Sequence, residues 1–355
     1  VIARNSAFAY KGRATNVQQI GRELGVAYVL EGSVQKSGNR LRITVQLIDT
    51  SNGAHLWAEK YDGALDDIFD LQDKITEQVA GAMQPSIRLA EVERSKRKRP
   101  QDLGAYDYTM RSLPHVWQLE QDAATKALEL LSKAMEIDET YPLARALAAW
   151  CWAQHSVYTW VDDTKAARDK ALALAESAAN NSTEDPLILT ILGTVHTFAR
   201  NYGAARVLLE RALQLDPNAA WTLSRLGWLA VYADRADEAE QYFQRAIRLS
   251  PLDPINFNNL VGLGSARQVA GDDVGAAEYF DRAMQERPNA VWVLRNHAAA
   301  LLGAGRLAEA EATCKTLMQY YPNFTVAKFK EAMVFSDKLL DRIGKQLEAL
   351  GVEPG

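Results

Sequence analysis

The chain has 355 residues, and at about 100–200 residues per domain this length predicts two or three structural units. A net charge of −5, with 40 Lys and Arg against 45 Asp and Glu, argues against a protein that coats nucleic acid by charge alone. No stretch approaches the roughly 18 consecutive apolar residues of a membrane helix, no signal peptide opens the chain, and two cysteines make no disulfide framework, so we expect a cytoplasmic protein without membrane insertion.

The first residues predict the start of a small domain. The chain opens on Val1 rather than Met, and residues 1–3 have the composition of a strand, so we expect a piece of a longer polypeptide. Residues 16–24 are predicted to form a short helix, because Asn16 can cap it and its apolar residues share one face. We expect this α+β domain to cover residues 1–64.

Three strand signals follow in the same domain. Residues 27–30 are a short apolar run, and the Gly-Asn step at residues 38–39, between two strand-like runs, is typical of a hairpin. Apolar and polar residues alternate over residues 41–48 and again over residues 55–61, as they do in half-buried strands. We therefore expect a mostly antiparallel sheet.

Residues 65–103 are predicted to be a helical connector with a basic end. Apolar residues keep helical spacing over residues 68–79, and Pro85 is expected to break or kink the helix. The basic run at residues 94–99 lacks interleaved aromatic residues and lies in an acidic protein. A solvated helix end is therefore favoured over a nucleic-acid site.

The rest of the chain repeats with a period near 34 residues. A Leu-Gly pair or its equivalent recurs at intervals of 34, 37 and 34 residues, and two small residues and a proline follow it at fixed distances. Small residues at fixed points let two helices approach closely, and the proline ends the second helix; this is the tetratricopeptide repeat pattern. The longer interval predicts an insertion at residues 252–254. The repeated positions are Gly193, Gly227, Gly264 and Ala298; Ala205, Ala239, Ala276 and Ala310; Ala212, Ala246, Ala283 and Leu317; and Pro217, Pro251, Pro288 and Pro322.

Looser copies and a cap extend the repeats on both sides. Residues 106–142 and 143–186 carry alanines at the right spacing, and residues 326–355 are predicted to form capping helices, since an uncapped stack exposes its apolar end. The predicted fold is mainly α: a small α+β N-terminal domain followed by an α–α superhelix of about six tetratricopeptide repeats over residues 104–325.

Several motifs of the first domain point to a family. They are VIARNS at residues 1–6, IGRELGV at 20–26, YVLEGSV at 28–34, HLWA at 55–58 and IFDLQD at 68–73. They closely resemble the C-terminal region of rhizobial-type class III adenylate cyclases, in which a TolB amino-terminal-like α/β domain precedes tetratricopeptide repeats and the catalytic domain lies upstream. The α/β domain of that family begins with one more strand and helix, so the resemblance implies a truncated copy here. The same arrangement also resembles the effector portion of winged-helix regulators of the CadC type.

We predict no catalytic residue, no cofactor and no metal site in this chain. A class III cyclase needs metal-binding aspartates on neighbouring strands, whereas the aspartates at positions 66, 67, 70 and 73 are predicted on a helix, where they suit the helix dipole. Cys151 and His155 stand four residues apart on a predicted helix, but two ligands do not make a zinc site, so core packing is favoured. The Gly-Leu-Gly at residues 262–264 follows no strand and precedes no Walker lysine, so close helix packing is favoured over a phosphate loop.

The groove of the superhelix is the best candidate surface. Aromatic and arginine side chains on its wall are typical interface anchors, and the repeats lack the Lys/Asn/Arg set of a chaperone-type carboxylate clamp, so we expect an apolar or amphipathic helix as ligand. The alternative is a groove filled by the chain's own C-terminal helices or by the α/β domain. The predicted groove residues are Thr190, Thr194, Trp221, Ser224, Trp228, Tyr232, Asn258, Trp292 and Arg295, with Leu187, Val261, Ser265 and Gln268 on the same wall.

The sequence therefore predicts a non-catalytic regulatory and interaction module. It is expected to bind a protein, a peptide or another part of its own polypeptide, with no nucleic acid bound by this chain, and to report binding to an upstream output domain through the curvature of the superhelix. Two alternatives remain: the sensing half of a winged-helix transcriptional regulator, and a free-standing repeat adaptor.

Overall fold

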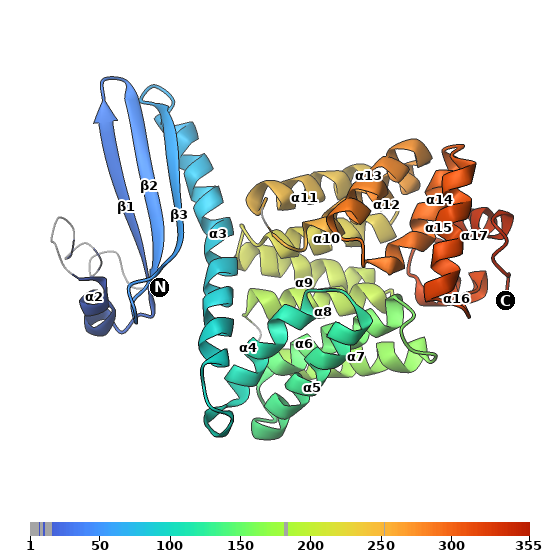
Figure 1. The fold of residues 1–355 in the computed structure, drawn as a ribbon, viewed down its shortest axis with the longest axis horizontal. Coiled ribbons are helices and arrows are strands. Elements are labelled where there is room, and N and C mark those ends of the chain that lie inside the picture. The colour runs from blue at the N-terminus through green and yellow to red at the C-terminus, as the bar shows by residue number, and fades with distance from the viewer. Residues whose placement is uncertain (1–6, 8–9, 11–15, 181–183, 252) are drawn as a thin grey trace. The chain divides into compact units, whose positions relative to one another are not determined.

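The computed structural model describes residues 7, 10, 16–180, 184–251 and 253–355, and the chain divides into two compact units, Val1–Arg94 and Ser95–Gly355 (Figure 1). The strand predicted over residues 1–3 lies outside the described residues, as does the first residue of the insertion predicted at 252–254. Each unit is described by itself below.

The first unit contains one short helix and an antiparallel sheet. Helix α2 (Val17–Leu24) begins where predicted, and the side chain of Asn16 accepts a hydrogen bond from the backbone N–H of Gln18 at 2.8 Å. Strands β1 (Tyr28–Ser37), β2 (Arg40–Asp49) and β3 (His55–Ala64) pair in the order β1-β2-β3. Ser37 pairs with Arg40 across the predicted two-residue turn, in which Gly38 has the positive φ of 60° that such a hairpin turn requires.

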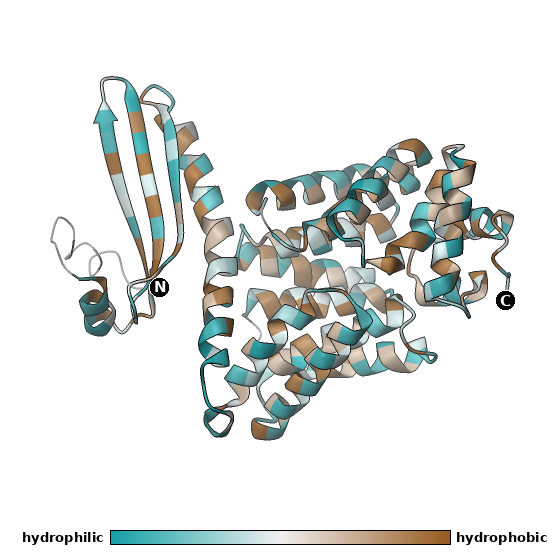
Figure 2. Cartoon of the chain, viewed as in Figure 1, coloured by the Kyte–Doolittle hydropathy of each residue, from teal (hydrophilic) through white to brown (hydrophobic). Residues whose placement is uncertain are grey.

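A helix packs on one face of this sheet. Hydrophobic and hydrophilic residues alternate along β2, as Figure 2 shows by colour, and Leu41 and Val45 are buried against Leu71, Ile75 and Val79 of α3 (Ile68–Lys96). Because α3 supplies half of this core, most of the segment expected to be a separate connector lies within the first unit.

Helix α3 corrects one sequence prediction. It continues through Pro85, so the break expected there is absent, while the alternative of a kink stays a prediction. Proline in a helix interior costs about 3 kcal/mol, and the burial of the helix on the sheet upstream of this residue offsets that cost. At the basic end, acids neutralise the cations: Arg94 pairs with Glu91 at 2.6 Å and Arg99 with Asp102 at 3.1 Å.

The second unit is a stack of helix pairs. In its described part no helix is both long and apolar enough to cross a bilayer. After the short turn η1 (Pro100–Asp102), the pairs are α4 (Ala105–Val116) with α5 (Gln121–Ile137), α6 (Pro142–Val157) with α7 (Thr164–Ala179), α8 (Pro186–Phe198) with α9 (Tyr202–Leu215), α10 (Ala220–Tyr232) with α11 (Ala236–Leu249), α12 (Asn256–Ala270) with α13 (Asp273–Glu286), and, after the turn η2 (Val291–Val293), α14 (Leu294–Gly303) with α15 (Leu307–Tyr320). The closing pair is α16 (Val326–Ala332) and α17 (Asp337–Ala349).

A left-handed turn follows the first helix of each of the six pairs from α4–α5 to α14–α15. A residue with positive φ recurs there, and in the third pair, for example, Asn201 N–H then bonds to the His196 carbonyl, as in a Schellman cap. This turn sends the chain back along its own first helix. The six residues are Leu119, Thr159, Arg200, Asp234, Gly271 and Gly305.

The glycine of each Leu-Gly pair receives a side chain from the second helix. A Cβ built on Gly193 would lie 2.7 Å from Leu209, one on Gly227 2.8 Å from Phe243, and one on Gly264 2.7 Å from Phe280. The repeated glycine is therefore set by close packing within each helix pair.

We expect Gly264→Ala to lower the free energy of unfolding by about 1–3 kcal/mol, because the added methyl overpacks against the Phe280 ring. Denaturant unfolding of the 355-residue chain measures this change. The double variant Gly264→Ala, Phe280→Leu is expected to recover part of it. The matched control is Gly203→Ala in α9, where an added Cβ meets no atom within 4 Å and is expected to leave stability unchanged or higher. Equal effects of the two glycine substitutions would contradict the packing account.

Candidate functional site on the inner face of the repeats

The predicted groove residues come from the first helices of four successive pairs. Helix α10 contributes four of them, and neighbouring first helices or the turn before α14 contribute the others. They are Thr190 and Thr194 of α8; Trp221, Ser224, Trp228 and Tyr232 of α10; Asn258 of α12; Trp292 of η2; and Arg295 of α14.

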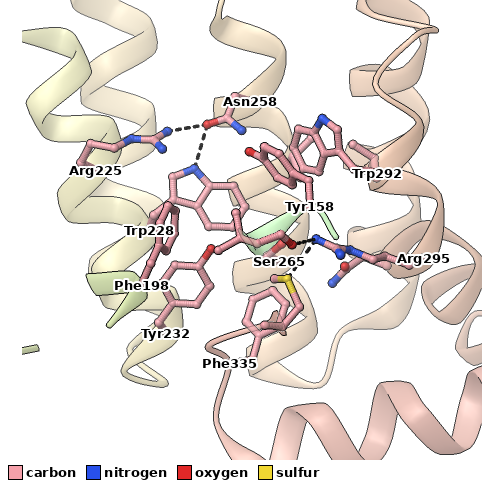
Figure 3. A pocket seen from close by; sticks show the side chains of 15 residues that line it. Tyr158, Phe198, Arg225, Trp228, Tyr232, Asn258, Ser265, Trp292, Arg295 and Phe335 are labelled. Carbon is pink, nitrogen blue, oxygen red and sulfur yellow. Dashed lines mark hydrogen bonds between the residues drawn. The ribbon is translucent and has the colours of Figure 1, made fainter. Parts of the chain in front are cut away.

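Five of the nine line one cavity. Trp228, Tyr232, Asn258, Trp292 and Arg295 surround it (Figure 3). Its volume is about 20 Å³, the space of about one water molecule, so the cavity has no room for a larger ligand in this conformation. The wall residues Val261 and Ser265 line it as well.

Of the other four, two are threonines of α8. The hydroxyls of Thr190 and Thr222 lie 2.8 Å apart and join α8 to α10, whereas the Thr194 hydroxyl donates to the Thr190 carbonyl of its own helix at 2.7 Å. Both predicted threonines are buried, so neither contributes to a free surface.

Trp221 and Ser224 surround a buried arginine. The Trp221 ring lies 4.9 Å from Trp117 and 5.7 Å from Trp150, and the Ser224 hydroxyl accepts a hydrogen bond from Arg225 at 3.0 Å. These contacts place the two predicted residues behind the cavity wall.

The cavity is covered by the chain's own residues Met333–Ser336, between α16 and α17, which we call the closing segment. Met333, Val334 and Phe335 are 4%, 0% and 1% exposed. The carbonyl of Met333 accepts from Arg200 at 3.0 Å and that of Val334 from the Tyr202 hydroxyl at 2.7 Å. Of the two alternatives left open by the sequence, the structure has the one in which the groove is filled by the chain's own C-terminal part.

Side-chain contacts close the cavity on two sides. The Phe335 ring lies 5.2 Å from Tyr232, and the Ser336 hydroxyl donates to Asp234 at 2.8 Å. From the other side, Tyr158 stacks on Trp292 at 4.4 Å, and Trp292 Nε1 donates to the carbonyl of Leu119 at 3.2 Å. The inner face is therefore closed by segments far apart in the sequence.

Two arginines lie on opposite sides of this cavity (Figure 3). Arg225, 4% exposed, donates to the side chain of Asn258, and Arg295, 3% exposed, donates to the carbonyl of Val157 at 2.9 Å and to the sulfur of Met333 at 2.9 Å. Burial lowers the pKa of Arg225 to about 10 and also lowers the pKa of Arg295, and no carboxylate is among the charged groups that act on either.

Sequence reasoning missed three residues that define this site. Repeat numbering placed Ser224 on the wall, whereas the cavity is lined by its neighbour Arg225, a shift of one position. Met333 and Phe335 were assigned to capping helices. In the sequence these two residues belong to the apolar run Met-Val-Phe between two predicted amphipathic helices. Such a run predicts burial but does not indicate the surface on which it packs.

The residues considered for metal binding lie in the core. Cys151 is fully buried, which raises the pKa of its thiol, and His155 lies between Trp152 and Trp160, where burial lowers its pKa. In the described ranges no three His, Cys, Asp or Glu residues come together in a way that holds a metal. Asp66 and Asp67 lie immediately before α3 rather than on facing strands.

Comparisons with known proteins give the class of the second unit. Residues 199–262 and 270–333 match the family model described as tetratricopeptide repeat. With the stacked helix pairs, this match shows that the second unit is a tetratricopeptide-repeat solenoid, as the sequence predicted.

One curated relative has a more specific name. Over 186 residues the chain is 38% identical to "Putative adenylate cyclase 3" of Rhizobium meliloti (strain 1021), and the match covers 52% of this chain and 32% of that protein. The chain thus spans about a third of the length of the relative it matches.

Solved structures resemble the chain at low identity. PilF of Pseudomonas aeruginosa is 19% identical, with 64% of this chain and 95% of that chain covered and a TM-score of 0.41. The APC/C hetero-tetramer Cut9-Hcn1 is 16% identical, with 79% and 49% covered and a TM-score of 0.49.

We expect Phe335→Ala to lower the free energy of unfolding of the second unit by about 3–5 kcal/mol and to shift tryptophan emission to the red, because water reaches the rings beside the closing segment. Denaturant titration followed by fluorescence measures both. The control is Tyr320→Ala on α15, 61% exposed, for which about 0.5 kcal/mol or less is expected. Indistinguishable curves for the two variants would show that the closing segment is not seated on the inner face.

Proposed function

We propose that this chain is a non-catalytic regulatory module that binds a protein or peptide on the inner face of its repeats and signals to an output domain upstream in the same polypeptide. The observation that carries the proposal is the inner face, where aromatic rings and two buried arginines surround one site. Such side chains are typical anchors of interfaces, and repeat solenoids use their concave surfaces for binding.

The proposed output domain is the catalytic domain of a class III adenylate cyclase. The 38% identity to the Rhizobium meliloti protein supports this assignment. In this interpretation the first unit, a three-stranded sheet covered by α3, is the TolB amino-terminal-like domain of that family, and the second unit is its regulatory repeat array.

The form of the ligand follows from what now covers the site. The closing segment is not helical: Met333 and Ser336 have extended backbone and Phe335 lies in a bend, and two of its carbonyls accept hydrogen bonds from Arg200 and Tyr202. A helix with its side chains is about 10–12 Å across, far wider than this cavity. An extended peptide that takes the place of the closing segment is therefore favoured over the amphipathic helix expected from the sequence.

Exchange of the closing segment for a ligand offers a route for the signal. The segment joins α16 to α17, and α17 packs on α14, which carries Arg295. Release of Met333 and Phe335 from the cavity therefore frees the link between the two closing helices, which can then repack. This coupling is the mechanism we propose for the regulatory output.

We expect Tyr202→Phe in the complete gene product to change cyclic AMP output by at least about twofold. The substitution removes one hydrogen bond to the Val334 carbonyl, about 0.5–1.5 kcal/mol, and so shifts the balance toward the open segment. Cyclic AMP formed from ATP by purified wild-type and variant proteins is the measurement. The isolated 355-residue chain is expected to form none.

The matched control is Tyr320→Phe, whose ring is exposed on α15. An active cyclase that responds equally to both substitutions would contradict the regulatory role. A complete gene product without cyclase activity would contradict the assigned output while leaving the interaction module in place. Turnover by the isolated chain would contradict the non-catalytic assignment.

A further inference from the structure

Arg225 and Arg295, which we call the arginine pair, are buried cations for which the described residues supply no carboxylate partner. The Nε of each has no hydrogen-bond partner among the described residues, although both side chains are more than nine-tenths buried. Aromatic faces lie beside them: Arg225 is 5.5 Å from the centre of the Trp150 ring, and Arg295 is 5.6 Å from that of Phe329. Burial of a cation with only such partners is unfavourable, and buried charges are ordinarily paired with an opposite charge.

The group that faces Arg295 is a weak acceptor. The Met333 sulfur lies 2.9 Å from the Arg295 Nη2, where a carboxylate oxygen would make a charge-assisted bond. A thioether in that place fills the space without supplying the charge. The closing segment therefore fills the space of the site but gives the positive charge of Arg295 no negatively charged partner.

The segment's backbone contacts show that the site accepts peptide. The carbonyls of Ala332, Met333 and Val334 accept hydrogen bonds from Arg168, Arg200 and Tyr202, respectively, and two residues beyond Met333 the Phe335 ring packs on Tyr232. A row of donors for carbonyls and a place for an aromatic ring suit an extended chain better than an isolated small anion.

We infer that Arg295 binds the carboxylate of an acidic residue in an extended peptide that carries a bulky apolar side chain two positions further on, with Arg225 on the opposite side of the same cavity, and that Met333–Phe335 holds this site closed until such a peptide displaces it. This inference rests on the proposed peptide-binding function and deepens it. It replaces the apolar or amphipathic helix expected from the sequence with an extended acidic peptide.

A substitution within the chain tests the site without a ligand. Met333→Glu places a carboxyl group where the thioether lies, and Met333→Gln places a neutral group of the same shape. We expect the Tm of Met333→Glu to exceed that of Met333→Gln by at least about 3 °C at pH 7.5, because a buried carboxylate is then paired with Arg295. In an Arg295→Gln background the difference should shrink or reverse.

The difference in stability between Met333→Glu and Met333→Gln is expected to depend on pH in one direction. Pairing lowers the pKa of the new carboxyl group in the folded protein, so its stabilisation is present above the unfolded value of about 4.3 and is lost as the pH falls through the folded value. The advantage of Met333→Glu should therefore disappear in acid. Other ionisable groups around the closing segment are Tyr158, Tyr202, Tyr232, Tyr321, Arg168, Arg200 and Asp234. A Met333→Glu protein less stable than Met333→Gln at pH 7.5 would overturn the inference.

A second experiment tests the peptide directly. The probes are synthetic peptides of residues 330–338, one carrying Met333→Glu and one Met333→Gln, titrated into the 355-residue chain and followed by fluorescence anisotropy. We expect the acidic peptide to bind at least about tenfold more tightly, and Ser336→Ala in the protein to tighten its binding several-fold, because the closing segment loses its bond to Asp234 while the peptide keeps its own serine.

The outcomes separate the two proposals. Preference for the acidic peptide, lost in Arg295→Gln, supports both. Equal binding of the acidic and neutral peptides keeps the inner face as a peptide site and overturns the carboxylate specificity. No binding of either peptide, even to the Ser336→Ala protein, overturns the peptide site and with it this inference.

Discussion

Two guanidinium groups buried without a carboxylate are the constraint that organises the inner face of the repeats. Aromatic and aliphatic side chains make up much of the face, and most of the hydrogen-bond partners of the two cations come from the chain's own carbonyls and side chains. The ends of two first helices supply carbonyls, from Leu119 to Trp292 and from Val157 to Arg295, and the closing segment supplies a sulfur. Aromatic faces cover what remains of the two cations.

The repeat geometry explains why these partners converge. In three of the pairs a glycine on the first helix admits a side chain from the second, so the two helices pack closely. The left-handed turn after each first helix then exposes carbonyls and side chains at that helix end, and two such residues, Arg200 and Asp234, hold the closing segment. The turn that recurs in the repeat pairs thus also supplies two residues that bond to the closing segment.

Local features were predictable from the sequence. The Asn16 cap, the hairpin at Gly38 and the repeated glycines depend on residues close in the chain or on a fixed period, and all are present. The continuity of α3 through Pro85 depends on packing against the sheet, which a local rule does not contain.

The candidate site was predictable only in part. Repeat numbering identified five residues that line the cavity, but missed Arg225 because a shift of one position on a helix changes the face. The cover depends on contacts between distant residues: Trp292 bonds to a carbonyl 173 positions away, and Arg200 to one 133 positions away. Neither the repeat period nor local secondary-structure propensity indicates contacts between such distant residues. The sequence therefore left open whether the groove is free for a ligand or filled by the chain itself.

Hydrogen–deuterium exchange across residues 333–336 tests the central claim most directly. We expect slow exchange in the free 355-residue chain, and faster exchange in this segment once the acidic peptide is bound, while α10 and α14 become more protected. Binding of that peptide with the segment's protection unchanged would contradict the claim that the chain's own residues occupy the ligand site.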